Sequence, residues 1–162
     1  MKILIAAVIS LFFSVKGFAV DLKQYQGKVV LVVNIATRCG YTGQLEGLEA
    51  IYKKYQQQGL VVLGVPSNDF GSQTPEVDEE VKKFCKLNYG VSFPLTAKTV
   101  VKGSGKDPVI AELLKASGNK EIEWNFEKFL VNRSGQVTER FSSKVTPQDS
   151  KLVSAIEAAL KK

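Results

Sequence analysis

A lone cysteine, Cys39, ends an apolar run and leads into a helical pattern. Val29–Ile35 is almost entirely β-branched or leucine, which predicts a buried strand, and apolar residues recur at helical spacing from Leu45 to Tyr55. Cys39 therefore stands in the turn before a helix N-terminus, whose partial positive charge favours a thiolate, and Arg38 adds a full charge. Because the thiolate is the nucleophile, the position suits a reactive cysteine. The competing interpretation is a small apolar residue that closes a turn.

Cys85 is the only other cysteine, and the chain contains no histidine. The lack of histidine excludes histidine acid–base catalysis and nearly all transition-metal chemistry, and two cysteines cannot close a structural zinc site. We therefore expect neither a metal nor a cofactor. Cys85 lies on or beside the buried face of a helix predicted over about 76–87. A disulfide between Cys39 and Cys85 is chemically permitted, but the sequence does not establish one.

Length and composition predict one ordinary globular domain. The chain has 162 residues, of which 23% are charged, and its 22 basic and 16 acidic residues give a net charge of +6. The basic residues are scattered and the aromatic residues have the spacing of core residues, so we predict no nucleic-acid surface.

The first 19 residues predict a signal peptide. Lys2 precedes an apolar stretch over 3–15, which is shorter than the roughly 20 residues that a spanning helix needs. Gly17 and Ala19 are small residues at the two positions that signal peptidase reads, so we expect cleavage after Ala19. A mature domain over 20–162 would then be periplasmic or secreted, with no stable membrane span. The alternatives are an uncleaved membrane anchor and a buried first strand.

The remaining pattern predicts an α/β domain. Two buried strands flank the first helix and form a βαβ unit with parallel strands. The polar loop over 66–75 leaves the second strand at the same edge as Cys39, where open α/β sheets build their sites. The expected elements are strands over 29–35, 60–65, 128–131 and 136–141 and helices over about 44–58, 76–87, 107–115 and from the capping residue Thr146 to the end. This order predicts a thioredoxin-like fold, with a central mixed β-sheet flanked by helices.

Four stretches follow one another along the chain: VNIATRCGYTGQLEGLEAIYKKY, LGVPSNDFGSQTP, FCKLNYGVSFPL and WNFEKFLVNRSGQVTERF. They cover most of the chain from about Gly27 to Pro147 and resemble the glutathione peroxidase family, within it the monomeric cysteine-containing members. The resemblance implies a thiol peroxidase that reduces hydrogen peroxide and organic or lipid hydroperoxides in defence against oxidative stress. It also implies a monomer, because the long insertion through which tetrameric members assemble is missing.

The resemblance implies a catalytic set of four residues. Cys39 would be the peroxidatic residue, and Gln73, Trp124 and Asn125 would complete the active site. Two amides and an indole N–H are neutral donors that can stabilise the departing oxygen of a peroxide. Taken alone, Trp124 is a core aromatic residue and the two amides are turn residues. One departure lies beside them, because Asp69 stands where the family usually has glutamine.

The resemblance also implies a resolving role for Cys85. Attack on a peroxide leaves Cys39 as a sulfenic acid, which condenses with another thiol. If the helix holds Cys85 inward, that turn must unwind before a disulfide can form, since the Cα atoms must come within about 7 Å. The competing interpretation is a buried helical cysteine that never meets Cys39. A thioredoxin-like protein is the expected reductant and glutathione the alternative.

Other functions remain open at this stage. A peroxide sensor or relay that passes the oxidation of Cys39 to a partner protein shares the same oxidised intermediate. A general disulfide oxidoreductase is disfavoured, because Cys39 is followed by Gly-Tyr-Thr and forms no CxxC motif. A purely structural or binding role leaves the four implied catalytic residues unexplained.

Overall fold

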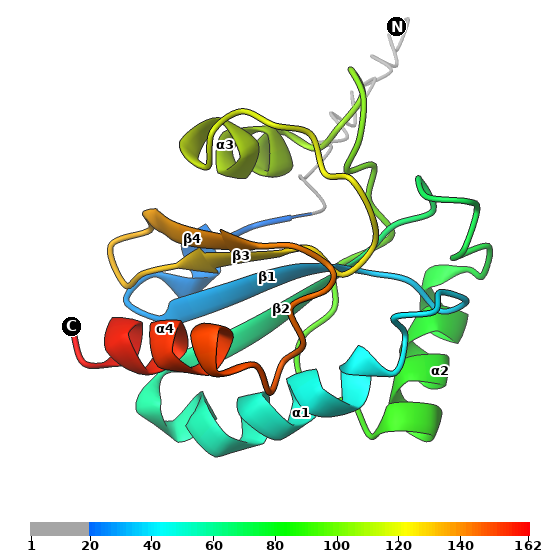
Figure 1. The fold of residues 1–162 in the computed structure, drawn as a ribbon. Helices are drawn as coiled ribbons and strands as arrows, with labels where there is room; N and C mark the ends of the chain where they lie inside the picture. Colours follow the sequence, from blue (N-terminus) through cyan, green and yellow to red (C-terminus); the bar gives the residue numbers. More distant parts are fainter. Residues whose placement is uncertain (1–19) are drawn as a thin grey trace, which may run out of the picture.

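The fold is built on a four-stranded sheet with the strand order β2-β1-β3-β4 (Figure 1). A computed structural model describes residues 20–162, and the predicted signal peptide over 1–19 lies outside the described residues. The strands are β1 (Val29–Ile35), β2 (Leu60–Pro66), β3 (Lys128–Val131) and β4 (Val137–Phe141). The helices are α1 (Gln44–Tyr55), α2 (Asp78–Tyr89), α3 (Pro108–Ala116) and α4 (Ser150–Leu160), with short 3-10 turns at Lys23–Tyr25 and Gln56–Gln58.

Strand β1 lies at the centre of the sheet. It pairs in parallel with β2 and antiparallel with β3, and β3 pairs antiparallel with β4. All seven residues of β1 are buried. The parallel βαβ unit, the C-terminal hairpin and the mixed sheet predicted from the sequence are therefore confirmed.

Helices cover both faces of the sheet. Helices α1, α2 and α4 lie on one face and α3 on the other (Figure 1). Alternate β1 residues point to opposite faces: Leu31 and Val33 join the core beneath α1 and α4, whereas Val30 and Val32 join the core beneath α3. This two-sided burial explains why β1 is a continuous apolar run. None of the helices among residues 20–162 has the length and apolar character needed to cross a membrane.

Helix α2 begins and ends two residues later than the predicted range 76–87, and boundaries of the first and last helices also differ from the predicted ones. The first helix leaves the α conformation after Tyr55 and continues as a 3-10 turn to Gly59, which takes the left-handed conformation at φ +103°. The prediction that Thr146 caps the last helix is wrong. Residues 146–149 form a turn, and Asp149 caps the helix by accepting a hydrogen bond from the backbone N–H of Lys151 at 2.8 Å. Both residue types cap helices, so the sequence offered two starting points.

Arg133, in the turn between β3 and β4, ties three distant segments together. Its Nη1 donates to the carbonyl of Gly27 at 3.0 Å, and its Nη2 donates to the carbonyls of Gln58 at 3.0 Å and Leu160 at 3.1 Å. These carbonyls belong to the segment before β1, the turn before β2 and the last turn of α4. A guanidinium suits this task because it presents several donors in a rigid plane and stays charged.

We predict that Arg133→Met lowers the free energy of unfolding by about 2 kcal/mol, because hydrogen bonds to charged groups contribute more than neutral ones. Urea denaturation of the purified protein measures the loss. Lys83→Met, which removes an exposed charge on α2, is the matched control and should change the free energy by less than about 0.5 kcal/mol. Equal small effects of the two substitutions would contradict the role assigned to Arg133.

Candidate active site

Cys39 lies half-buried in the turn that joins β1 to α1. The turn is held from within: the backbone N–H of Cys39 donates to the hydroxyl of Thr42 at 3.0 Å, and that hydroxyl donates to the carbonyl of Ala36 at 3.0 Å. The backbone N–H of Tyr41 donates to Sγ of Cys39 at 3.4 Å. One backbone N–H therefore points at the sulfur.

Arg38, the neighbouring cation, is paired with Glu76. Its Nε donates to one carboxylate oxygen of Glu76 at 2.7 Å, and the hydroxyl of Thr37 donates to the other at 2.7 Å. Burial alone would raise the pKa of Glu76, but the hydrogen bonds from Thr37 and Arg38 outweigh it and hold that pKa below its ordinary value. The pair is therefore present at neutral pH and is lost only as the pH falls below that ordinary value. The positive charge of Arg38 therefore interacts with the carboxylate of Glu76 as well as with the turn that holds Cys39.

Gln73 lies next to the same turn. Its backbone carbonyl accepts a hydrogen bond from the backbone N–H of Arg38 at 3.0 Å. The hydroxyl of Thr37, whose proton is shared with Glu76, lies 3.2 Å from the same carbonyl. Its side-chain oxygen accepts a hydrogen bond from Nδ2 of Asn125 at 2.9 Å. Because this bond uses the acceptor end of the Gln73 amide, the NH₂ end is left as a donor.

The third segment of the site contains Trp124 and Asn125. Asn34, near the end of β1, donates from Nδ2 to the carbonyl of Trp124 at 3.0 Å and accepts from the backbone N–H of Phe126 at 2.6 Å. The indole of Trp124 is 39% exposed, and its ring centre lies 5.8 Å from that of Phe70. Asn125, in contrast, is fully buried, and its Oδ1 has no hydrogen-bond partner among the described residues.

Three loops thus meet at the end of β1 and carry Cys39, Gln73 and the Trp124–Asn125 pair. The structure brings these four residues to one edge of the sheet. Sequence reasoning missed Asn34 and Glu76, which hold the loops together. Asn34 was detectable as the one polar residue inside the apolar run of β1, since a buried amide needs partners.

Asp69, the departure from the family pattern, supports the Gln73 loop. Its carboxylate accepts hydrogen bonds from the backbone N–H groups of Val101 at 2.6 Å and Lys102 at 3.1 Å. These contacts fasten the loop after β2 to the segment before α3. Asp69 is therefore a polar anchor of the loop that carries Gln73.

Cys85 is placed differently from the other predicted residues. It is fully buried on α2, both cysteines are free thiols, and burial raises the pKa of Cys85 to about 11. Cys85 belongs to the core between α2 and the sheet, and Cys39 packs against the margin of that same core. The structure therefore places the two cysteines against one core without joining them. Among residues 20–162, no three His, Cys, Asp or Glu side chains gather as a metal site.

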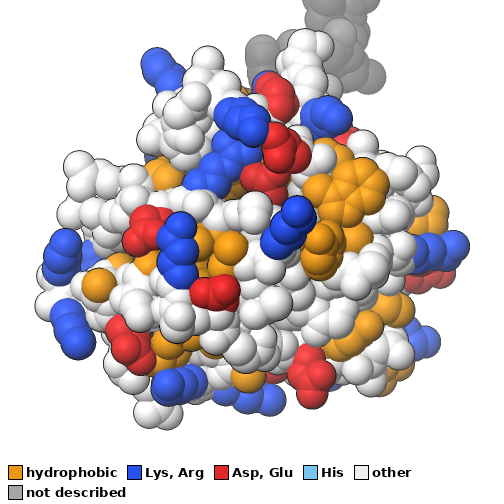
Figure 2. All heavy atoms as spheres, viewed as in Figure 1, with side chains coloured by type: hydrophobic (Ala, Val, Ile, Leu, Met, Phe, Trp, Pro, Cys, Tyr) orange, Lys and Arg blue, Asp and Glu red, His pale blue; other side chains and the backbone are white. Residues whose placement is uncertain are grey.

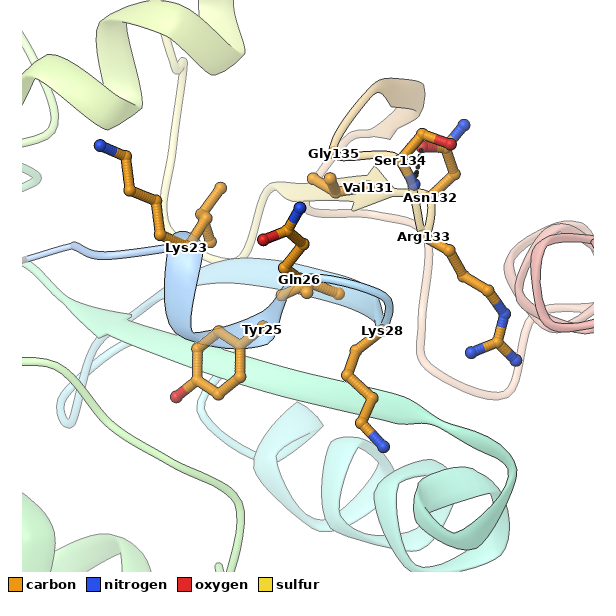
Figure 3. A pocket seen from close by; sticks show the side chains of 11 residues that line it. Lys23, Tyr25, Gln26, Lys28, Val131, Asn132, Arg133, Ser134 and Gly135 are labelled. Carbon is orange, nitrogen blue, oxygen red and sulfur yellow. Dashed lines mark hydrogen bonds between the residues drawn. The ribbon is translucent and has the colours of Figure 1, made fainter.

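Two cavities lie at opposite ends of β1. One, of about 430 Å³, is lined by Trp124, by Tyr41, which follows Cys39 by two residues, and by Lys144. Hydrophobic side chains also gather on the side of the molecule where β1 ends, whereas basic and acidic side chains are interspersed over the rest of the visible face (Figure 2). The other cavity, of about 440 Å³, lies where β1 begins, and Gln26 points into it (Figure 3). Only the first cavity adjoins the candidate site.

The comparisons with known proteins agree with this geometry. The family model described as glutathione peroxidase matches residues 10–114. The chain belongs to the glutathione peroxidase family. A relative from Schizosaccharomyces pombe, the glutathione peroxidase-like peroxiredoxin gpx1, is 55% identical over 126 residues, which cover 76% of this chain and 80% of the relative. The chain is therefore an oxidoreductase of the peroxidase class.

Solved structures support the same family and fold. The crystal structure of Trgpx in apo form matches with a TM-score of 0.70 and 38% identity, covering 88% of this chain and 87% of the other. A thiol:disulfide interchange protein of the thioredoxin family from Chlorobium tepidum matches with a TM-score of 0.65 and 18% identity, covering 86% of this chain and 84% of the other. The second likeness shows the fold alone. The predicted thioredoxin-like fold is confirmed.

We predict that Asn125→Leu slows the oxidation of Cys39 by hydrogen peroxide about 100-fold, the scale on which loss of one active-site donor acts. The substitution removes the donor that orients Gln73 and leaves a similar volume. Rapid alkylation followed by mass spectrometry measures the loss of the Cys39 thiol with time. Asn88→Leu, which alters an exposed asparagine on α2, is the control, and an equal rate in both variants would contradict the prediction.

Proposed function

We propose that this peroxidase reduces hydroperoxides through Cys39, with Gln73, Trp124 and Asn125 as the donors that stabilise the reacting oxygens. The observation that carries the proposal is the Asn125–Gln73 hydrogen bond, because the backbone of Gln73 is in turn bonded to the Cys39 turn through the N–H of Arg38, so that three distant segments meet. The cavity beside Trp124 offers room for the organic part of a larger hydroperoxide. The protein acts as a monomer in defence against oxidative stress.

In the first step the Cys39 thiolate attacks one peroxide oxygen. A sulfur–oxygen bond forms, the oxygen–oxygen bond breaks, and the departing alkoxide or hydroxide takes up a proton and leaves as alcohol or water. Cys39 is then a sulfenic acid. Amide and indole N–H groups suit this step, because they stabilise developing negative charge on oxygen without having to titrate.

In the second step Cys85 resolves the sulfenic acid. Its thiolate attacks the sulfur of Cys39, a disulfide forms, and the hydroxyl group leaves as water. The raised pKa and complete burial of Cys85 mean that α2 must open locally before this attack. A thioredoxin-like dithiol then reduces the disulfide by exchange.

We predict that peroxide consumption by the wild-type protein is supported by thioredoxin with thioredoxin reductase, and that this turnover collapses in Cys85→Ser. Without Cys85 the Cys39 sulfenic acid has no internal thiol with which to form the disulfide that thioredoxin reduces. Peroxide loss is followed in parallel with glutathione and glutathione reductase as the alternative donor.

Leu87→Ser changes an exposed residue of the same helix and should leave thioredoxin-supported turnover unchanged. Turnover with glutathione that survives Cys85→Ser would make Cys85 a core residue only. No turnover with either donor by the folded wild-type protein would favour a peroxide sensor that passes its oxidation to a partner protein.

We also propose that the protein is exported and cleaved after Ala19, and works in the periplasm or outside the cell. One contact of the described residues supports this. The backbone nitrogen of Val20 lies 3.4 Å from a carboxylate oxygen of Asp107, and Asp107 is largely buried. Cleavage would turn that nitrogen into an α-ammonium facing a carboxylate. The other carboxylate oxygen of Asp107 accepts from the backbone N–H of Val109 and caps α3.

We predict that the exported protein begins at Val20, as mass spectrometry of the intact protein would reveal. We also expect Asp107→Ser, which keeps a helix-capping side chain, to destabilise the form that begins at Val20 by about 1 kcal/mol more than its N-terminally acetylated counterpart, since acetylation removes the terminal charge. Urea denaturation of the four proteins measures the difference. Equal losses would mean that Asp107 serves the helix alone.

A further inference from the structure

Lys128, the first residue of β3, is a fully buried lysine that the mechanism does not use. In the sheet it pairs with Val33 of β1 and Phe141 of β4. Because side chains alternate along a strand, Lys128 shares the face of Leu130, which belongs to the core beneath α1 and α4. A charged side chain therefore lies inside an apolar layer, three residues after Asn125 and four after Trp124 along the chain.

The structure gives this ammonium one partner. Nζ of Lys128 donates to the backbone carbonyl of Phe126 at 2.7 Å. Among the described residues no carboxylate forms an ion pair with it, because the adjacent Glu127 accepts from Nε and Nη2 of Arg140 at 3.0 and 2.8 Å. Burial lowers the pKa of Lys128 to about 8, and Glu127 opposes that shift only in part. A buried charge with one neutral partner is expensive for the fold, so a role in packing alone does not account for it.

The partner carbonyl belongs to an unusual residue. Phe126 is fully buried and takes a positive φ of +66°, a conformation that is strained for a bulky side chain. Its N–H donates to the carbonyl of Asn34 at 2.6 Å, and its carbonyl accepts from Lys128. The residue is therefore held at both of its backbone polar groups, which keeps it in the strained conformation.

This conformation decides how the neighbouring residues lie. Asn125 immediately precedes Phe126 and is buried, with its amide bonded to Gln73, whereas Trp124 is partly exposed beside Phe70. If the Phe126 carbonyl lost its donor, the strain at Phe126 would be free to relax, and the Asn125–Gln73 bond would be the first site contact to shift.

We propose that Lys128 is a positioning residue of the peroxidase site, which holds the carbonyl of Phe126 and thereby keeps Asn125 against Gln73 beside Cys39. The proposal rests on the function proposed above, because it assigns Lys128 to the reaction of Cys39 with hydroperoxides. Lys128 touches neither the sulfur nor the substrate and acts through Phe126 and Asn125.

Lys128→Met tests the proposal, because methionine keeps the apolar stem and removes the donor and the charge. The rate constant for oxidation of Cys39 by hydrogen peroxide is expected to fall at least tenfold. The melting temperature is expected to stay the same or rise, since a buried charge has been removed. Trp124 is the only tryptophan of the chain, so quenching of its fluorescence by acrylamide reports the loop directly and is expected to increase.

Lys128→Arg keeps both charge and donor and should recover part of the rate, and Lys83→Met is the surface control. A Lys128→Met protein that reacts as fast as wild type would overturn the proposal. A lower melting temperature with unchanged quenching of Trp124 would assign Lys128 to the fold instead. If Lys128→Met does not fold, the same comparison is made with Lys128→Gln. A folded wild-type protein whose Cys39 does not react with peroxide would refute the proposed function and leave these structural readouts to decide the role of Lys128.

Discussion

The site depends on the hydrogen bonds of one buried residue, Asn34. Its side-chain Nδ2 donates to the carbonyl of Trp124, its backbone carbonyl accepts from the N–H of Phe126, and its backbone N–H donates to the carbonyl of Glu127 at 3.4 Å. The strand that carries Cys39 at its end is thereby fastened to the loop that carries Trp124 and Asn125. These bonds use the backbone and the Nδ2 of Asn34, whereas its buried Oδ1 has no partner among the described residues. The hydrogen bonds of Asn34 therefore serve to assemble the site, although they do not satisfy the whole amide.

The loop after β2, which carries Gln73, is fastened to the same end of β1 by a hydrogen bond and an ion pair. The backbone N–H of Arg38, in the turn after β1, donates to the carbonyl of Gln73, and Glu76 bridges Thr37 and Arg38. Both loops are thus fastened to β1, a strand whose seven residues are all buried and which pairs with both β2 and β3. Residues far apart in the sequence can keep a fixed relation to Cys39, because each is tied to the part of the fold that is least free to move.

Sequence reasoning reached the fold because its signals are local: apolar runs mark the buried strands, and glycine and proline mark their ends. The family resemblance identified Gln73, Trp124 and Asn125 as candidate site residues, and the structure places them close together. Neither the local signals nor the family resemblance could predict the contacts between distant segments. A lysine that opens a strand reads as exposed, so the burial of Lys128 follows only from the register of β3. The Arg38–Glu76 pair likewise exists only once the loop after β2 has folded back over the turn.

Asn125 keeps its place at a cost to the fold. Its Oδ1 is buried and has no donor among the described residues, and a buried acceptor without a donor lowers the free energy of unfolding. An apolar side chain of the same shape would avoid that cost. The residue that orients Gln73 is therefore not the residue that would make the fold most stable.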